Sequence, residues 1–281
     1  MVEYSLIVLA KTDSEFIFKM NEDCFNTFIK SIEYIDSTFE IILIESNEKA
    51  NYVYSIQNLK IITPKADFNF HKFLNIGIKE ASGNYYILSN NDVKYTKEWL
   101  ANLQHVAFNN PKIQSFSPYD QKSNKLPMES IKSNSFILGY QIQKHLTGWC
   151  IIMHKNVINK IKKLDEKFNF YYADFDYAMQ LQKYNIKHAL VTNAKVNHLE
   201  SVSYNQENNI NYSELPSDTP KYLINENWTW ILKDKKMVEG VISYHKKWGS
   251  RRSIKVKLYA IKLLKSIGLG FFSRFILTTK Y

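Results

Sequence analysis

Four carboxylates and one histidine occupy positions from which side chains can take part in chemistry. They are Glu45, Asp92, Asp174, Asp176 and His198. Carboxylate oxygens are the ligands that hard divalent ions prefer, an imidazole nitrogen favours Mn²⁺ over Mg²⁺, and a carboxylate beside a hydroxyl can act as a general base. Each residue also has an ordinary interpretation, because Asn and Asp are common in turns and acids are common in the first turn of a helix. Their chemistry therefore depends on whether the fold brings them together.

The segments that must position these residues alternate between strand and helix patterns. Short buried strands are predicted at residues 4–10, 40–44, 59–63, 85–88, 113–117 and 188–196. Residues 146–154 are predicted to form a turn followed by another buried strand. Apolar spacing predicts helices at 15–34, 68–81, 98–108, 156–163, 174–184 and 253–264, whereas 123–140 looks irregular. This alternation predicts βαβ units and a mostly parallel sheet. Ligands of such sheets bind at the carboxyl ends of the strands, where Asn90-Asn91-Asp92 follows the strand at 85–88.

Composition and missing motifs exclude several classes of function. The chain has 281 residues and is 45% hydrophobic, which is enough for a large core. No G-x-G-x-x-G follows the first strand and no G-x-x-x-x-G-K-[ST] occurs, which disfavours dehydrogenases and kinases. Cys24 and Cys150 lie far apart and outside any Cys/His cluster, so neither a disulfide nor a zinc site is expected. The first residues lack a signal-peptide pattern and no apolar stretch is long enough to span a membrane, so we expect a cytoplasmic protein.

Charge is concentrated at one end of the chain. Residues 221–281 contain 14 Lys and Arg against 3 Asp and Glu, whereas the first 220 residues contain 23 against 24. A basic tail rich in Trp and Tyr favours contact with an anionic membrane surface, and we expect peripheral attachment at the inner face of the plasma membrane. The near-neutral remainder and the absence of a recognition motif argue against nucleic-acid binding.

Three segments carry a resemblance to a known family. Residues 68–85 are similar to a helix that ends N-x-G-x-x-x-A-x-G-x-Y before a D-x-D strand, residues 147–153 to a T-G-x-x-x-x strand, and residues 164–176 to L-D-E-x-F…Y-x-E-D-x-D. In order and spacing, residues 4–201 resemble the family-2 glycosyltransferases with a GT-A fold. The resemblance implies an α/β fold with a Rossmann-like, mostly parallel central sheet flanked by helices, to which this chain adds a basic, largely helical C-terminal extension.

The resemblance also divides the chain. It implies a glycosyltransferase domain at residues 1–204, with a nucleotide-sugar-binding half at 1–92 and an acceptor and catalytic half at 93–204. Residues 205–220, rich in Asn, Glu, Ser, Asp and Pro, are expected to be a linker or mobile loop, and residues 221–281 form the extension.

Residue roles follow from the resemblance, position by position. Asp92 matches the last acid of D-x-D and would bind a divalent metal, Mn²⁺ or Mg²⁺, with His198 as the second protein ligand. Asp174 matches the general base that takes the proton of the acceptor hydroxyl while displacement inverts the anomeric carbon. The implied donor-binding residues are Thr12, Asp13, Glu45, Asn75, Asn91 and Asp92. The implied acceptor-binding residues are Thr147, Gly148, Trp149 and Asp176.

The chain departs from the family pattern at several positions. Asn90 replaces the first acid of D-x-D, Ala173 replaces the Glu of the E-D pair, and the segment after the first strand lacks the usual P-x-Y/N. The expected activity is inverting transfer of a sugar from a UDP-sugar, with dTDP- or GDP-sugars as other donors. The acceptor is expected on a bacterial surface polysaccharide or lipid-linked glycan. A protein or soluble glycan as acceptor, and a non-catalytic protein that binds a nucleotide-sugar or glycan, are the alternatives.

Overall fold

The chain, in a computed structural model that describes residues 2–199 and 215–280, forms two compact units. The first, here called the sheet unit, comprises residues 1–68, 72–164 and 186–201. The second, the helical unit, comprises residues 69–71, 165–185 and 202–281. The sequence prediction placed 165–185 in the first domain, whereas in the structure this segment packs with the C-terminal helices. Of the predicted linker, residues 205–214 lie outside the described part of the chain.

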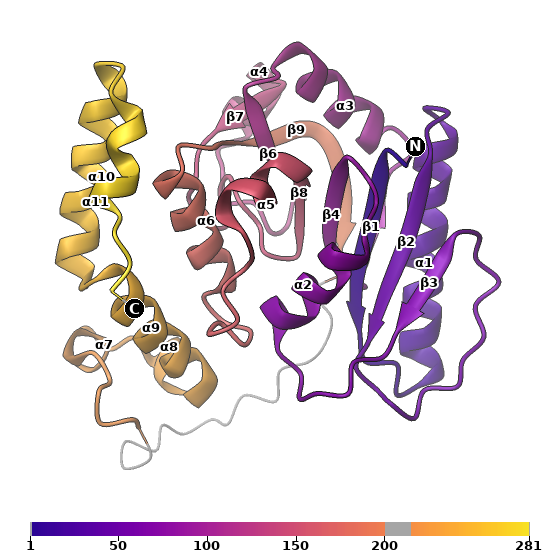
Figure 1. Cartoon of the computed structure of the whole chain (residues 1–281), viewed down its shortest axis with the longest axis horizontal. Coiled ribbons are helices and arrows are strands. Elements are labelled where there is room, and N and C mark those ends of the chain that lie inside the picture. Colours follow the sequence, from indigo (N-terminus) through magenta and orange to yellow (C-terminus); the bar gives the residue numbers. More distant parts are fainter. Residues whose placement is uncertain (1, 200–214, 281) are drawn as a thin grey trace. The chain divides into compact units, whose positions relative to one another are not determined.

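One nine-stranded sheet forms the centre of the sheet unit (Figure 1). Its strands are β1 (Tyr4–Ala10), β2 (Phe39–Glu45), β3 (Leu59–Ile62), β4 (Tyr85–Asn90), β5 (Val93–Tyr95), β6 (Ile113–Tyr119), β7 (Phe136–Leu138), β8 (Cys150–His154) and β9 (Lys187–His198). They are ordered β3-β2-β1-β4-β8-β6-β9-β5, and β7 pairs with β9. β1 to β4 are parallel, β6 is parallel to β9, and β8 is antiparallel to both β4 and β6. The predicted mostly parallel sheet is therefore confirmed.

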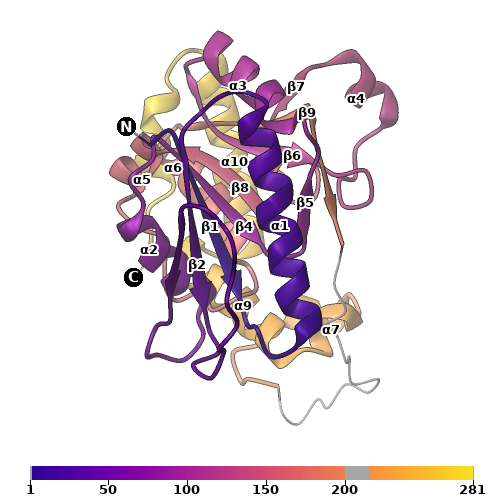
Figure 2. The same cartoon turned by 90° about the vertical axis from the view of Figure 1, so that its right-hand side faces the viewer.

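Helices flank this sheet. They are α1 (Glu15–Glu33), α2 (Phe70–Glu80), α3 (Trp99–Asn109), α4 (Met128–Ser133) and α5 (Lys155–Ile161). In Figure 2, α1 crosses the near face of the sheet, on which it buries Phe25 and Phe28 completely. Its N-cap is Ser14, whose hydroxyl accepts a hydrogen bond from the N–H of Ile17 and so satisfies one backbone donor of the first turn. β1 is buried along its whole length, as expected for a central parallel strand.

Two glycines of the first family-like segment allow close packing against β1. A Cβ on Gly77 in α2 would overlap the side chain of Ile7. A Cβ on Gly83 would lie 2.8 Å from the backbone nitrogen of Ser5, and the Gly83 N–H donates to the Ser5 hydroxyl at 2.9 Å. These glycines therefore let α2 and the start of β4 approach the first strand, which places the end of β4 beside the end of β1.

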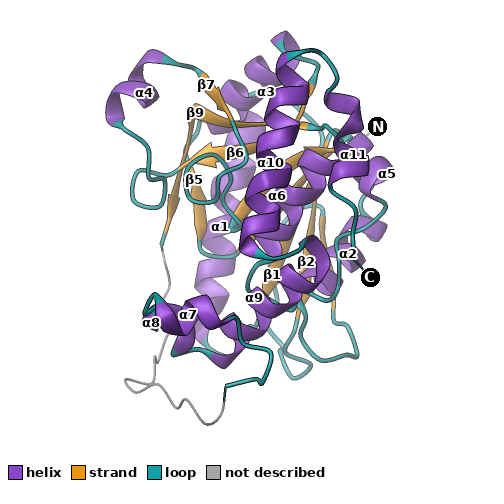
Figure 3. Ribbon diagram, turned by 90° about the vertical axis from the view of Figure 1, so that its left-hand side faces the viewer, coloured by secondary structure: helices purple, strands orange, loops and turns teal. Residues whose placement is uncertain are grey.

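The helical unit is built around short helices and two longer ones (Figure 3). Its elements are α6 (Ala173–Lys183), α7 (Lys221–Asn225), α8 (Thr229–Leu232), α9 (Lys235–Trp248), α10 (Arg251–Ser266), the 3₁₀-helix η2 (Gly270–Phe272) and α11 (Ser273–Ile276). α6 contacts α9 and α11, and α10 contacts α11. Buried residues shared by these elements include Met179, Trp248, Ile261 and Leu277. Every described helix of the protein is too short or too polar to cross a membrane.

The structure contains several elements that the sequence analysis did not predict, among them four that lie near the sheet or before α10. The segment at 123–140, predicted to be irregular, contains α4 and β7, and neither β5 nor α9 was predicted. β5 and β7 have only three residues each and are defined by pairing with β9, so no local pattern identifies them. α9 carries lysines among its apolar residues, yet Asp234 marks its start by accepting from the N–H groups of Lys236 and Met237.

Candidate active site

Three parallel strands of the sheet unit deliver polar side chains to one hydrogen-bonded cluster. Glu45, the last residue of β2, accepts from the Thr12 N–H at 3.0 Å and from the Thr12 hydroxyl, just after β1. Asn21 of α1 donates to Thr12 Oγ1 at 2.9 Å. Asn91, just after β4, donates to Asn21 Oδ1 at 2.8 Å. The fold therefore brings together Thr12, Glu45 and Asn91, three of the residues selected from the sequence.

Further residues of this cluster were missed by the sequence analysis. Asn21 joins its parts, Asn47 donates to the Thr12 carbonyl at 2.7 Å, and the Tyr54 hydroxyl accepts from Asn21 at 2.8 Å. The Tyr52 ring stacks on Phe18 with centroids 4.9 Å apart. The only signal in the sequence is the alternation N-Y-V-Y at residues 51–54, which supplies two aromatic side chains after the second strand.

The chain brings Asp92 and His198 into direct contact. Asp92 follows β4 and His198 ends β9, and the antiparallel pairing of β5 with β9 sets Val93 opposite His198. Asp92 Oδ2 lies 3.4 Å from His198 Nε2, and both side chains are largely buried. The Trp149 ring stacks on the imidazole with centroids 4.8 Å apart and an interplanar angle of 12°. Trp149 therefore fixes the plane of the ring that meets Asp92.

Asp120 is a buried carboxylate that the sequence analysis did not select. It follows β6, and its Oδ2 accepts from the Ser123 N–H at 2.7 Å and from the Ser123 hydroxyl at 2.8 Å. Its Oδ1 accepts from the backbone N–H of His198 at 3.3 Å. Asp120 thus positions both His198 and Ser123, whose Oγ lies 3.3 Å from His198 Nδ1. The sequence feature that could have identified Asp120 is its position at the end of a strand, which it shares with Glu45 and Asp92.

These residues fit a divalent cation. If Nδ1–H of His198 donates to Ser123, Nε2 is left with a lone pair directed to the side of Asp92, which is the usual arrangement of a metal-binding histidine. One carboxylate and one imidazole suit Mn²⁺, which completes its shell with other oxygen ligands. Among the described residues no group of three or more His, Cys, Asp or Glu could bind a metal, so further ligands would come from phosphates or water.

Other predicted donor and acceptor residues lie elsewhere or make structural contacts. Asp13 is exposed, 4.0 Å from Lys11. Asn75 exchanges two hydrogen bonds with the backbone of Leu164, at 2.9 and 3.0 Å, which ties α2 to that segment. Thr147 is buried, and its N–H donates to Ser117 Oγ at 3.3 Å. Gly148 directly precedes Trp149, the residue that stacks on His198.

Asp174 belongs to the helical unit, in the first turn of α6. Its Oδ1 accepts from the Phe175 N–H at 2.8 Å, and the partial positive charge of the helix start favours its anion. Asp174 keeps an intermediate solvent exposure, yet desolvation by the surrounding chain dominates and raises the pKa of its carboxyl to about 6. Tyr172, the N-cap, has the left-handed backbone φ of 64°, a costly conformation for a bulky residue, and its ring stacks on Phe175. A carboxyl that titrates near neutrality is suited to general base catalysis.

Asp176 is engaged in a buried ion pair of the helical unit. Its Oδ1 lies 2.7 Å from Lys247 Nζ and accepts from Trp248 Nε1 at 2.8 Å. Lys247 also contacts Asp165 Oδ2 at 2.7 Å. Burial raises the pKa of Asp176 to about 6 against the opposing effect of Lys247. These contacts give Asp176 a structural task, and acceptor binding by it stays a prediction.

A family model for glycosyl transferase family 2 matches residues 15–183 of the chain, from α1 to the end of α6. The chain belongs to glycosyl transferase family 2. The match includes both Asp92 and Asp174. A search of curated proteins finds no relative with significant sequence similarity to this family 2 chain.

Solved structures of glycosyltransferases share the GT-A fold of this family 2 chain. GalNAc-T7 with UDP, GalNAc and Mn²⁺ matches over 97% of this chain and 54% of its own, with a TM-score of 0.65 and 11% identity. S. aureus TarS residues 1–349 match over 68% of this chain and 58% of the TarS chain, with a TM-score of 0.54 and 14% identity. The catalytic domain of Drosophila β1,4-galactosyltransferase 7 with xylobiose matches over 76% of this chain and 79% of its own, with a TM-score of 0.50 and 9% identity. The chain therefore spans little more than half of TarS 1–349 and GalNAc-T7.

Proposed function

We propose that this family 2 chain is an inverting glycosyltransferase that moves a sugar from a UDP-sugar to an acceptor hydroxyl. The observation that carries the proposal is the contact of Asp92 with His198 at 3.4 Å, next in sequence to Asn91 of the Thr12–Glu45–Asn21 cluster. A metal-binding pair adjoining a polar cluster at the ends of parallel strands is suited to a nucleoside diphosphate. The Mn²⁺ and UDP named for the GalNAc-T7 structure support the same choice.

Each part of this site has a separate task in the proposal. Glu45, Thr12 and Asn21 would present hydrogen-bonding groups to the base and ribose, and the Tyr52 ring, which stacks on Phe18 of the helix that carries Asn21, would contact the base. Asp92 and His198 would hold the metal. When bound, Mn²⁺ or Mg²⁺ neutralises charge on the leaving diphosphate without any proton transfer.

Asp174 is the proposed general base. The acceptor hydroxyl gives its proton to the Asp174 carboxylate as its oxygen bonds to the anomeric carbon. The bond from that carbon to the diphosphate breaks on the opposite face, and UDP leaves with the electron pair. Attack opposite the leaving group inverts the anomeric configuration. The raised pKa of Asp174 allows the carboxylate to accept this proton near neutral pH.

Incubation with Mn²⁺ and a panel of UDP-, dTDP- and GDP-sugars tests this function. Wild type is expected to release UDP, faster when an acceptor glycan is present. Asp92→Ala is expected to lower this rate by about 10²–10³-fold, because it removes a metal ligand that acts on the leaving group. Exposed Asp67 in the same unit provides the control, and Asp67→Ala should retain the wild-type rate.

Binding measurements separate the alternatives. UDP affinity should rise on addition of Mn²⁺ in wild type and not in Asp92→Ala; equal Mn²⁺ dependence in both would refute the metal site. Saturable binding of UDP-sugar with no UDP release across glycan acceptors would identify a non-catalytic binding protein instead.

We also propose that the helical unit attaches the enzyme to an anionic membrane, where a lipid-linked glycan of a bacterial surface polysaccharide would be the acceptor. Six large apolar side chains, each more than half exposed, support this proposal. We call them the apolar stripe: Val256, Tyr259, Leu263, Ile267, Phe271 and Phe275. Four recur at helical spacing along and just after α10, and exposed Arg252, Lys255 and Lys262 lie among them. This combination is typical of a helix that lies in the membrane interface.

The apolar stripe could be covered by a bilayer or by a second copy of the chain, and the charge around the stripe favours the bilayer. Residues 240–281 contain ten Lys and Arg and no Asp or Glu. Two apolar stripes packed face to face would bring these like charges together, whereas anionic lipids would neutralise them. The bilayer is therefore the occupant that we propose.

Vesicle binding tests the membrane proposal. Leu263→Ser is expected to weaken binding to phosphatidylglycerol vesicles by about 10-fold, because a buried leucine contributes roughly 1.5–3 kcal/mol. Phe108→Ser, at a strongly exposed apolar residue of the sheet unit, is the matched control and should bind normally. Raising the salt concentration should release wild type. If Leu263→Ser leaves vesicle binding intact and instead dissociates a dimer, the stripe is an interface between copies.

A further inference from the structure

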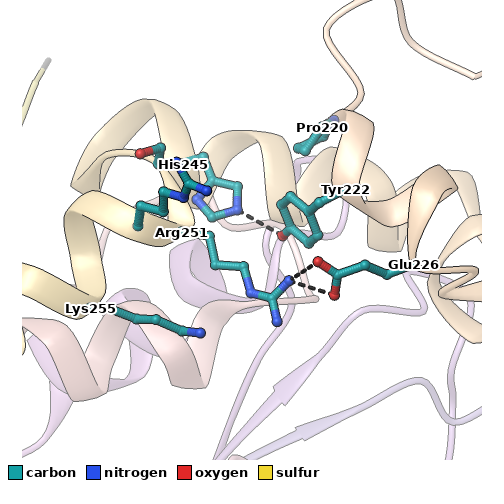
Figure 4. A pocket seen from close by; sticks show the side chains of 8 residues that line it. Pro220, Tyr222, Glu226, His245, Arg251 and Lys255 are labelled. Atoms are coloured by element: carbon teal, nitrogen blue, oxygen red, sulfur yellow. Dashed lines mark hydrogen bonds and ion pairs between the residues drawn. The ribbon is translucent and has the colours of Figure 1, made fainter.

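A cavity of about 570 Å³ lies in the helical unit at the start of α10. Figure 4 shows its lining, which includes Tyr222 and Glu226 from the α7 region and His245 from α9. α10 contributes Arg251, Arg252 and Lys255. None of these residues has a task in the proposed transfer reaction.

The Arg251 guanidinium is held in place on several sides. It pairs with both oxygens of Glu226 at 2.6 Å. It also lies over the rings of Tyr222 and Trp228, 5.0 and 5.1 Å from their centroids. Such a guanidinium is pre-organised, and it retains donor groups beyond the one nitrogen that contacts Glu226.

The cavity carries an excess of positive charge. Burial lowers the pKa of His245, which favours a neutral imidazole. Its Nδ1 then donates to the Gly249 carbonyl at 2.9 Å, and its Nε2 accepts from the Tyr222 hydroxyl at 2.9 Å. The charged lining groups are then Arg251, Arg252 and Lys255 against Glu226 alone. Within the described residues, neither Arg252 nor Lys255 forms an ion pair with a carboxylate.

Glu226 compensates only one of the three positive charges at this cavity. Arg251 and Lys255 are four residues apart on α10, so their like charges lie on one helix face and repel each other. An anion in the cavity would relieve that repulsion and receive charge-assisted hydrogen bonds from Arg252 and Lys255. The volume exceeds that of a phosphate ion, which leaves room for the group that carries it.

We propose that this cavity binds the phosphate group of an organic phosphate ester, through Arg252 and Lys255 with Arg251 positioned by Glu226. The ester is either a phospholipid headgroup or a soluble phosphate such as a sugar phosphate. This site is separate from the proposed donor site of the sheet unit and needs no divalent metal.

Titration calorimetry with glucose 1-phosphate, in EDTA to prevent metal-dependent binding at Asp92, tests the soluble source. Wild type is expected to bind one equivalent. Arg252→Ala/Lys255→Ala should bind about 10- to 100-fold more weakly, because each lost charge-assisted contact costs roughly tenfold. Lys262→Ala/Arg274→Ala is the matched control. It removes the same charge at exposed positions outside the cavity lining and should bind as wild type.

The variant Glu226→Gln is expected to bind the phosphate ester more tightly than wild type. Its side chain is about half exposed, so the fold should tolerate the change. The Gln carbonyl oxygen can still accept from Arg251 and hold it in position, whereas the negative charge that opposes a phosphate is lost, so affinity should rise several-fold. A drop in affinity would mean that Glu226 serves the site differently and would overturn the assignment of Arg251.

Vesicles of phosphatidylglycerol, compared with neutral phosphatidylcholine, test the lipid source. If only the vesicles bind, and Arg252→Ala/Lys255→Ala loses more affinity than its charge-matched control, the ligand is a headgroup. If the two double variants lose equal vesicle affinity, binding depends only on the total positive charge, and the cavity site is overturned. No binding of either probe would overturn it as well.

Discussion

Replacing Asp174 with asparagine is expected to lower kcat for sugar transfer by about 10²–10⁴-fold, the usual contribution of a general base. Asparagine keeps the size of the side chain and can still accept from the Phe175 N–H, so α6 should remain folded. It cannot take the proton of the acceptor. UDP binding should be unchanged, because the proposed donor residues lie in the sheet unit. Asp218→Asn, at an exposed acid of the helical unit paired with Lys246, is the control and should keep wild-type kcat.

The pH dependence of the rate provides a second readout of the same group. Burial raises the pKa of Asp174 to about 6, and the ionised form is the one that accepts a proton. The rate should therefore be constant above about pH 7 and fall about tenfold per pH unit below pH 6. Asp174→Asn should lose this dependence along with its activity. A variant that turns over at the wild-type rate, or an identical profile in both proteins, would remove Asp174 from the mechanism.

Replacing Lys247 with methionine is expected to lower the free energy of unfolding by about 3–5 kcal/mol, the range measured when one partner of a buried ion pair is removed. Lys247 is only 3% exposed at its side chain and lies 2.7 Å from both Asp165 and Asp176. Methionine fills a similar volume but leaves two carboxylates without their cation. Urea unfolding followed by circular dichroism measures the effect.

Two further variants identify the cause of that loss. Lys246→Met removes the neighbouring, exposed lysine that pairs with Asp218, and it should change stability by less than about 1 kcal/mol. Asp176→Asn combined with Lys247→Met should recover part of the loss, because one of the stranded charges is gone. No recovery in the double variant would show that packing of the Lys247 stem matters more than its charge. Equal destabilisation by Lys246→Met would show that the loss does not depend on the buried ion pair.

Much of the sheet and part of the site could be predicted because the signals are local. The strands are short apolar runs between polar clusters, and the helices carry apolar residues at regular spacing. Strand-end positions led to Glu45 and Asp92, whose surroundings the structure now describes. Motif order added His198, which the structure places in contact with Asp92.

What could not be predicted depends on contacts between distant residues. Asn21 is one polar residue on an amphipathic helix, and only the fold shows that it joins Thr12 to Asn91. Asp120 resembles any acid after a strand until its bonds to Ser123 and the His198 backbone are seen. Lys247 is one of many lysines in the tail, and nothing near it in the sequence indicates two buried acids as its partners.

The ion pairs of Lys247 change how the C-terminal extension should be regarded. A fragment that ends at residue 204, the domain boundary suggested by the sequence, would retain Asp165 and Asp176 but lose their cation, together with Trp248, which packs in the same core as Phe168 and Met179. Such a fragment would fail by misfolding of the segment that carries Asp174, whatever the extension does at a membrane. Truncation therefore cannot separate targeting from catalysis in this protein, and only point substitutions on its outer surface can.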